Sequence, residues 1–200
     1  MTTQSLQKPA LIPVQVPWRI STSDASLSVQ LSEDRTAFPT LVDFVGLFAH
    51  KKVDSRSSAK ADGQVAHAFP SFEETRPPAK SPYHLVRVVF DGGFWAQLSP
   101  SVSETHTVRD GDYDWSAVPT GMLPGEKVHE NLERTRKLWL STGICPDPGM
   151  YEVRDSPRLE RQRLASQPKW KHYLLLGSDA YLEVLAQGWE WKLGQPLQGW

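Results

Sequence analysis

Alternating apolar and polar residues predict β-strands in two long stretches of the chain. Within residues 83–98, two β-rich runs flank a glycine turn at 91–93, which is the sequence pattern of a β-hairpin. Within residues 170–193, two further runs flank a turn at 177–179, and Gly188 interrupts the second run as at a bulge or bend. We therefore expect one hairpin near 83–98 and another near 170–193.

Apolar residues at three- and four-residue spacing predict helices elsewhere. Near 39–51 the apolar side chains fall on one helical face, which favours a helix there. Near 125–142 the same spacing recurs together with i,i+4 pairs of Glu and basic residues, and Gly143 supplies a C-terminal stop. Ser156 and Pro157 are the residue types of an N-cap and a first helical position, so a short charged helix is expected after them.

These elements indicate an α+β fold with an antiparallel sheet, because strands and a few helices follow one another without a βαβ alternation. Residues 53–82 are rich in Ser, Pro and scattered charges, and we expect a mobile loop or linker there. It would separate the N-terminal strands and helix of 1–52 from a main α+β body in 83–200. One domain overall is the alternative for a chain of 200 residues.

Composition narrows the classes of function. The 22 basic and 23 acidic residues leave a net charge of −1, which gives no electrostatic footprint for nucleic acid. The single cysteine, Cys145, allows neither an internal disulfide nor a Cys-based zinc site. No stretch approaches the roughly 18 apolar residues of a membrane span, and no secretory leader is recognisable. We expect a cytoplasmic protein with no membrane association, no cofactor and no metal.

The chain shows no nucleophile elbow, phosphate-binding loop or dinucleotide-binding motif. His84 and His172 each stand beside a tyrosine in a predicted strand. If the two hairpins were neighbours, these histidines would meet in a cleft and act as an acid–base pair. Glu183 and Asp179 would supply the carboxylates. Each of these residues has a more ordinary interpretation as a packing or surface residue.

Eight tryptophans suggest a binding surface. In the C-terminal region, aromatic and charged residues of both signs occur close together, as in the energetic centres of protein interfaces. The binding candidates are Trp189, Trp191, Tyr181 and Trp95. Trp189 and Trp191 would share one face of a strand. Core packing is the competing interpretation for all four.

The hypothesis that follows is a non-catalytic protein-binding or interaction module. In size and general character the chain is similar to small bacterial accessory proteins, such as immunity proteins that block a partner toxin, although it shares no motif with them. The expected partner is another protein, nucleic acid is not expected, and the oligomeric state stays open. The alternative is an enzyme of an unfamiliar family with a His/Glu/Asp acid–base site.

Overall fold

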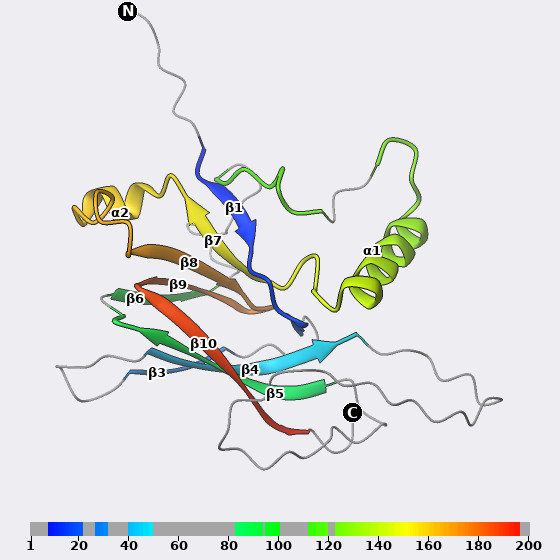
Figure 1. Cartoon of the computed structure of the whole chain (residues 1–200), viewed down its shortest axis with the longest axis horizontal. Coiled ribbons are helices and arrows are strands. Elements are labelled where there is room, and N and C mark those ends of the chain that lie inside the picture. Colours follow the sequence, from blue (N-terminus) through cyan, green and yellow to red (C-terminus); the bar gives the residue numbers. More distant parts are fainter. Residues whose placement is uncertain are drawn as a thin grey trace, which may run out of the picture.

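The chain forms a sandwich of two antiparallel sheets (Figure 1). The computed structural model describes residues 8–21, 27–31, 40–49, 83–93, 95–100, 112–119 and 123–196. Sheet A contains, in spatial order, β1 (Ala10–Pro13), β7 (Met150–Arg154), β8 (Lys171–Leu176), β9 (Ala180–Ala186) and β6 (Trp95–Pro100). Sheet B contains β10 (Gly188–Pro196), β5 (Tyr83–Asp91) and β4 (Thr40–Phe48), and β4 also pairs with β2 (Trp18–Ile20) and β3 (Ser28–Leu31).

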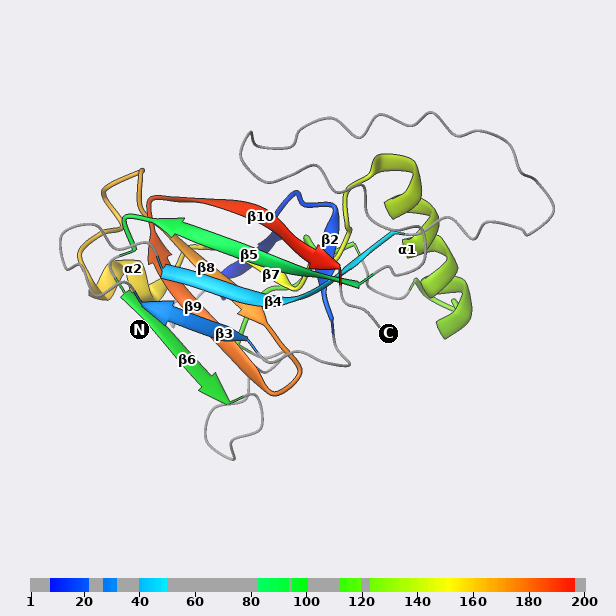
Figure 2. The same ribbon diagram turned by 90° about the horizontal axis from the view of Figure 1, so that it is seen from below.

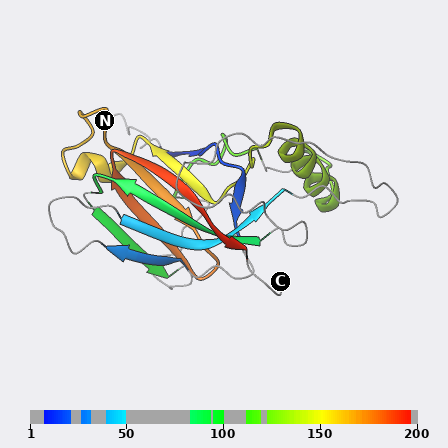
Figure 3. The same cartoon turned by 60° about the horizontal axis from the view of Figure 1, so that its bottom comes forward.

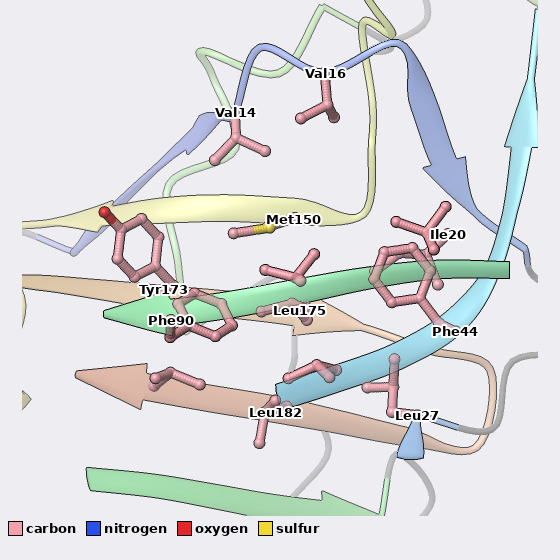
Figure 4. Packing of buried hydrophobic residues seen from close by; sticks show 14 of the residues in the cluster. Val14, Val16, Ile20, Leu27, Phe44, Phe90, Met150, Tyr173, Leu175 and Leu182 are labelled. Atoms are coloured by element: carbon pink, nitrogen blue, oxygen red, sulfur yellow. The ribbon is translucent and has the colours of Figure 1, made fainter. Parts of the chain in front are cut away.

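The main core lies between the two sheets (Figure 4). Phe44 and Phe90 from sheet B meet Met150, Leu175 and Leu182 from sheet A, and all five are buried. Full burial of one such side chain contributes about 1.5–3 kcal/mol. This interface between the sheets therefore supplies the main apolar driving force of the fold.

The hairpin predicted near 83–98 is wrong, although both of its strands exist. β5 pairs with β4 and β10 in sheet B, whereas β6 pairs with β9 in sheet A. The turn at 91–93 carries the chain from one sheet to the other instead of folding it back on itself. At this corner the backbone N–H of Gln187 donates to the carbonyl of Asp91, at 2.9 Å.

The second predicted hairpin, near 170–193, is divided between the sheets. β8 and β9 pair antiparallel on either side of the turn at 177–179. The chain then changes sheet at Gln187, and from Gly188 onward β10 pairs with β5. Gly188 therefore marks the point at which the chain crosses from sheet A to sheet B.

The helix predicted near 39–51 is wrong, because this segment is the central strand β4. Val42, Phe44 and Gly46 are buried facing the core, while the residues between them lie on the less buried face. A Cβ on Gly46 would lie 2.6 Å from a methyl carbon of Val86, so only glycine fits this position without a shift. Apolar residues on both faces of a strand produced the helix-like spacing.

The N-terminal strands are part of both sheets, since β1 pairs with β7 and β4 pairs with β5. The described residues of 1–52 and of 83–200 thus build one sandwich together. The predicted loop at 53–82 lies outside the described residues. At the level of class, the structure is α+β with mostly antiparallel sheet, as predicted.

Two helices lie outside the sandwich, at opposite ends of its long axis in all three views (Figures 1, 2 and 3). Helix α1 (Val128–Thr142) is the helix predicted near 125–142, and Gly143 ends it in the left-handed conformation. Helix α2 (Pro157–Arg161) follows its N-cap Ser156, as predicted. Neither helix has the length and apolar character needed to span a membrane, within the residues described.

Candidate functional site

The outer face of sheet A, away from the sandwich core, carries a buried polar network beside α2. Tyr173 of β8 and Val184 of β9 point into the core. Because side chains alternate along a strand, His172 and Glu183 point to the opposite, outer face. They are diagonal neighbours, since Leu174 is the residue directly opposite Glu183. The strand register therefore brings a histidine and a carboxylate together.

The two ring nitrogens of His172 face different partners. Nε2 lies 3.3 Å from Oε1 of Glu183, and both side chains are almost completely buried. Nδ1 lies 2.8 Å from Oγ of Ser156, which is also buried. His172 thus stands between a hydroxyl and a carboxylate.

The helix cap assigns the protons in this row. Oγ of Ser156 accepts the backbone N–H groups of Arg158 and Leu159, at 3.2 and 3.3 Å. A hydroxyl has two lone pairs and one hydrogen, so the hydrogen of Ser156 is left to donate to Nδ1 of His172. Nδ1 then carries no hydrogen of its own, so the ring hydrogen is on Nε2, facing Glu183.

Arg158 completes the network from the side of the helix. Its Nε and Nη2 donate to the two carboxylate oxygens of Glu183, at 3.1 and 2.6 Å, and its guanidinium carbon lies 4.2 Å from the centre of the Trp95 ring. Burial alone would raise the pKa of Glu183, but His172 and then Arg158 outweigh burial and lower it. Glu183 is therefore an ionised, compensated carboxylate at neutral pH.

The row Ser156, His172 and Glu183 contains the residue types of a nucleophilic triad. A serine nucleophile needs a free lone pair with access to a substrate carbonyl. Ser156 is only 3% exposed, and both of its lone pairs already accept backbone N–H groups. This geometry indicates that Ser156 attaches α2 to sheet A, and it does not favour nucleophilic attack by Ser156.

Of the four catalytic candidates, the structure brings together only His172 and Glu183. His84 is buried on β5 in sheet B, where its ring packs against Phe48 with centroids 5.3 Å apart. Asp179 is exposed in the turn between β8 and β9, where its carboxylate accepts the hydroxyl of Ser178. His84 and His172 do not meet, because one faces the core from sheet B and the other lies on the outer face of sheet A.

The four binding candidates divide between two faces. Trp189 and Trp191 pack against the main core, and the ring of Trp191 lies 6.3 Å from that of Trp18. Tyr181 and Trp95 belong to the outer face of sheet A and are half-buried. The described structure therefore gathers no single surface from these four residues.

Sequence reasoning missed Ser156 and Arg158 as partners of the histidine. The sequence indicated that Ser156 caps α2. An N-cap hydroxyl normally bonds only the backbone N–H groups of its own helix, and no neighbouring residue indicates that this hydroxyl also reaches His172 on β8. The bidentate geometry of Arg158 likewise depends on the distance between α2 and β9. Only the three-dimensional arrangement shows this assembly.

A second feature, on the opposite side of the molecule, is an accumulation of exposed apolar side chains at α1. Five of the seven exposed large apolar residues of the described chain lie between 123 and 144. We call them the apolar α1 surface: Leu123, Val128, Leu132, Leu138 and Ile144. Monomeric proteins rarely concentrate exposed apolar area without a binding role.

Helix α1 is well formed but joined to the sandwich at few points. Trp139 is its one buried residue, and its indole N–H donates to the carbonyl of Pro17 at 3.1 Å. Before the helix, Glu126 accepts from Arg134, from the backbone N–H of Leu123 and from Asn131. Hydrogen bonds from Arg134 and then Leu123 lower the pKa of Glu126 to about 2. The two ends of α1 are therefore ordered, while Val128 and Leu132 stay exposed on its surface.

Within the described ranges, no group of three His, Cys, Asp or Glu side chains is arranged to hold a metal ion. Burial raises the pKa of Cys145 to about 12, so its thiol is protonated at neutral pH. Comparison with known protein families, curated proteins and solved structures gives no match for this chain.

Proposed function

We propose that this chain is a non-catalytic protein-binding module that docks its partner on the apolar α1 surface. The observation that carries the proposal is the exposure of Val128 and Leu132, whose side chains are 65% and 60% exposed on one face of a regular helix. An apolar helix face laid into a groove of another protein is a common mode of recognition, and Val128 and Leu132 are spaced i, i+4 as such anchors are.

The ordered ends of α1 support this proposal. Glu126 and its partners fix the start of the helix, and Gly143 donates its backbone N–H to the carbonyl of Trp139 at the end. A helix that is already formed loses little conformational entropy on binding, so more of the contact energy contributes to affinity. The partner expected is a protein with an apolar groove that accepts Val128 and Leu132, one helical turn apart.

An enzyme with an acid–base site is the second candidate, and one observation favours it. A histidine and a carboxylate lie side by side, with Nε2 of His172 3.3 Å from Oε1 of Glu183. All hydrogen-bonding groups of Ser156 are already in use, however, and Glu183 is bound on both oxygens. Loss of a measured activity in His172→Gln, in a protein of unchanged fold, would favour the enzyme over the binding module.

The binding proposal is tested by affinity capture from lysate of the source organism with the wild type and two single variants. Leu132→Glu places a charge in the apolar α1 surface, whereas Lys137→Glu changes a charge elsewhere on the same helix. We expect one stoichiometric partner with the wild type and with Lys137→Glu, and its loss with Leu132→Glu. Equal capture by all three proteins would contradict docking at α1.

A further inference from the structure

Positive charge is concentrated in the connection between β7 and β8. Residues 154–171 contain six basic and two acidic residues, a net charge of +4 in a chain whose total is −1. This connection includes α2 and lies at the end of the sandwich opposite α1 (Figure 1). The near-neutral total therefore conceals a local basic region.

Two of the six basic residues have their charge compensated, and four do not. Arg158 is bound to Glu183, and Lys171 forms an ion pair with Glu152 at 2.7 Å. The other four are exposed and have no ion pair with any residue that the structure describes; they form the basic α2 surface: Arg154, Arg161, Arg163 and Lys169. These four cations are available to a partner, and together with the exposed Asp155 and Glu160 of the same connection they leave a net charge of +2.

The backbone beneath this surface is held in place. Ser156 caps α2 and reaches His172, and Leu164 is buried below the loop that follows. Backbone hydrogen bonds from Leu164 to Leu159 and from Gln167 to Leu164 close successive turns. Arg163 stands in the left-handed region at φ 58°, which is uncommon for a residue other than glycine. The cations therefore project from an ordered support.

We infer that the basic α2 surface is a second docking site, which binds an acidic segment of a protein partner. Arginine side chains bind carboxylates through paired N–H donors, and three of the four free cations are arginines. The patch is short, and the remainder of the chain is net acidic, so it fits a few carboxylates better than a long phosphate backbone. This inference does not depend on the apolar α1 surface, because it uses the opposite end of the sandwich.

The test is a fluorescence-anisotropy titration of the full chain with a fluorescein-labelled peptide of eight glutamates, at about 20 mM and about 150 mM salt, where screening differs strongly. Arg161→Glu and Arg163→Glu are compared with Lys137→Glu, which makes the same change of charge on α1. An oligonucleotide of equal charge serves as the alternative polyanion. Circular dichroism and thermal unfolding verify the fold of each variant, and Arg161→Gln and Arg163→Gln replace any reversal variant that does not fold.

We expect saturable peptide binding that weakens with salt, a loss of about tenfold or more in either arginine variant, and a change below about twofold in Lys137→Glu. An equal loss in all three variants would overturn the inference, since net charge alone would then explain binding. Tighter binding of the oligonucleotide would overturn it in favour of a phosphate ligand, and no binding at low salt would overturn it outright. Leu132→Glu should bind the peptide normally, so failure here is distinguishable from failure of docking at α1.

Discussion

The two helices outside the sandwich are attached to it in opposite ways. Helix α2 has 5 residues and none of them is buried, yet Ser156 and Arg158 tie it to His172 and Glu183 on sheet A. Helix α1 has 15 residues, a left-handed Gly143 at its C-terminal end and a single buried side chain, Trp139. The longer and more regular helix is thus the one less integrated into the fold. Regularity of an element and its attachment to the core are separate properties.

The comparison also inverts the usual distribution of residue types. Near α2, polar side chains are buried in contact with one another, whereas at α1 large apolar side chains face solvent. Buried polar groups are costly when one partner is lost, because the remaining partner cannot return to water. An exposed apolar side chain can be removed at little cost to the fold. Variants near α2 should therefore affect stability, and variants on the open face of α1 should affect binding.

The largest expected effect is that of Glu183→Ala, which leaves His172 and Arg158 without their shared carboxylate. Breaking a buried ion pair from one side costs about 3–5 kcal/mol of unfolding free energy. Urea denaturation measures it. Glu190→Ala, which removes a half-exposed pair with Lys192, should cost less than about 1 kcal/mol. Similar losses in both variants would remove the distinction between the network and a surface ion pair.

Trp139→Ala should have the next largest effect, because it removes the one buried side chain of α1. We expect the unfolding free energy to fall by about 2–3 kcal/mol. This is no more than the lowest values for truncation of a tryptophan in a core, because the helix lies outside the core. Limited proteolysis should cut within 123–144 while the sandwich stays intact. Trp139→Phe keeps most of the apolar area and loses only the bond to Pro17, which is worth about 1 kcal/mol. Proteolysis no faster than in the wild type would show that α1 is held by other contacts.

The pH dependence of stability should depend on the α2 network. The pKa of Glu183 is lower in the folded state than the ordinary value, about 4.3 in the unfolded chain. Its contribution is therefore complete above the unfolded pKa and is lost as pH falls through the folded pKa. Unfolding free energies measured by urea between pH 6 and pH 3 should fall less steeply in Glu183→Gln than in the wild type. Identical slopes would exclude Glu183 as a source of the acid dependence.

The smallest expected effect is that of Leu132→Ala on the open face of α1. A side chain that is 60% exposed contributes little, and the unfolding free energy should change by less than about 0.5 kcal/mol. Leu174→Ala is the matched control, since that leucine is fully buried on the outer face of sheet A and its truncation should cost about 2–5 kcal/mol. A large loss in Leu132→Ala would mean that the apolar α1 surface is packed in solution.

Features that depend on local chemistry could be predicted from the sequence. Helix α1, its stop at Gly143 and the cap at Ser156 are determined by neighbouring residues, and all three are present. The strand pairing of β5 was not predictable in this way. The turn at 91–93 looks the same whether the chain folds back or crosses to another sheet, and only contacts with distant strands decide between them.

The same division holds for the candidate site. His172 and Glu183 were both identified as candidates, and they meet because β8 and β9 are consecutive strands. Ser156 and Arg158 lie in the connection between β7 and β8. The course of this connection could not be predicted from the spacing of apolar residues. The helix prediction for 39–51 was wrong for a different reason. Leu41, Val45 and Leu47 provide apolar side chains on the second face of the strand as well. The apolar residues of such a segment match the spacing of a helix and that of a strand. Its position between β5 and β2 makes it a strand.

The crossing of the chain between sheets at Asp91 and Gln187 has a consequence for the order of folding. β5 receives one of its two neighbours, β10, from residues 188–196, and β1 finds its partner β7 about 140 residues later in the chain. Contacts between such distant segments form slowly, because long loops must close before pairing stabilises them. During synthesis, sheet B keeps an open edge until β10 leaves the ribosome. Refolding should therefore be slow for the size of the chain, and newly made chains should depend on protection of the β5 edge.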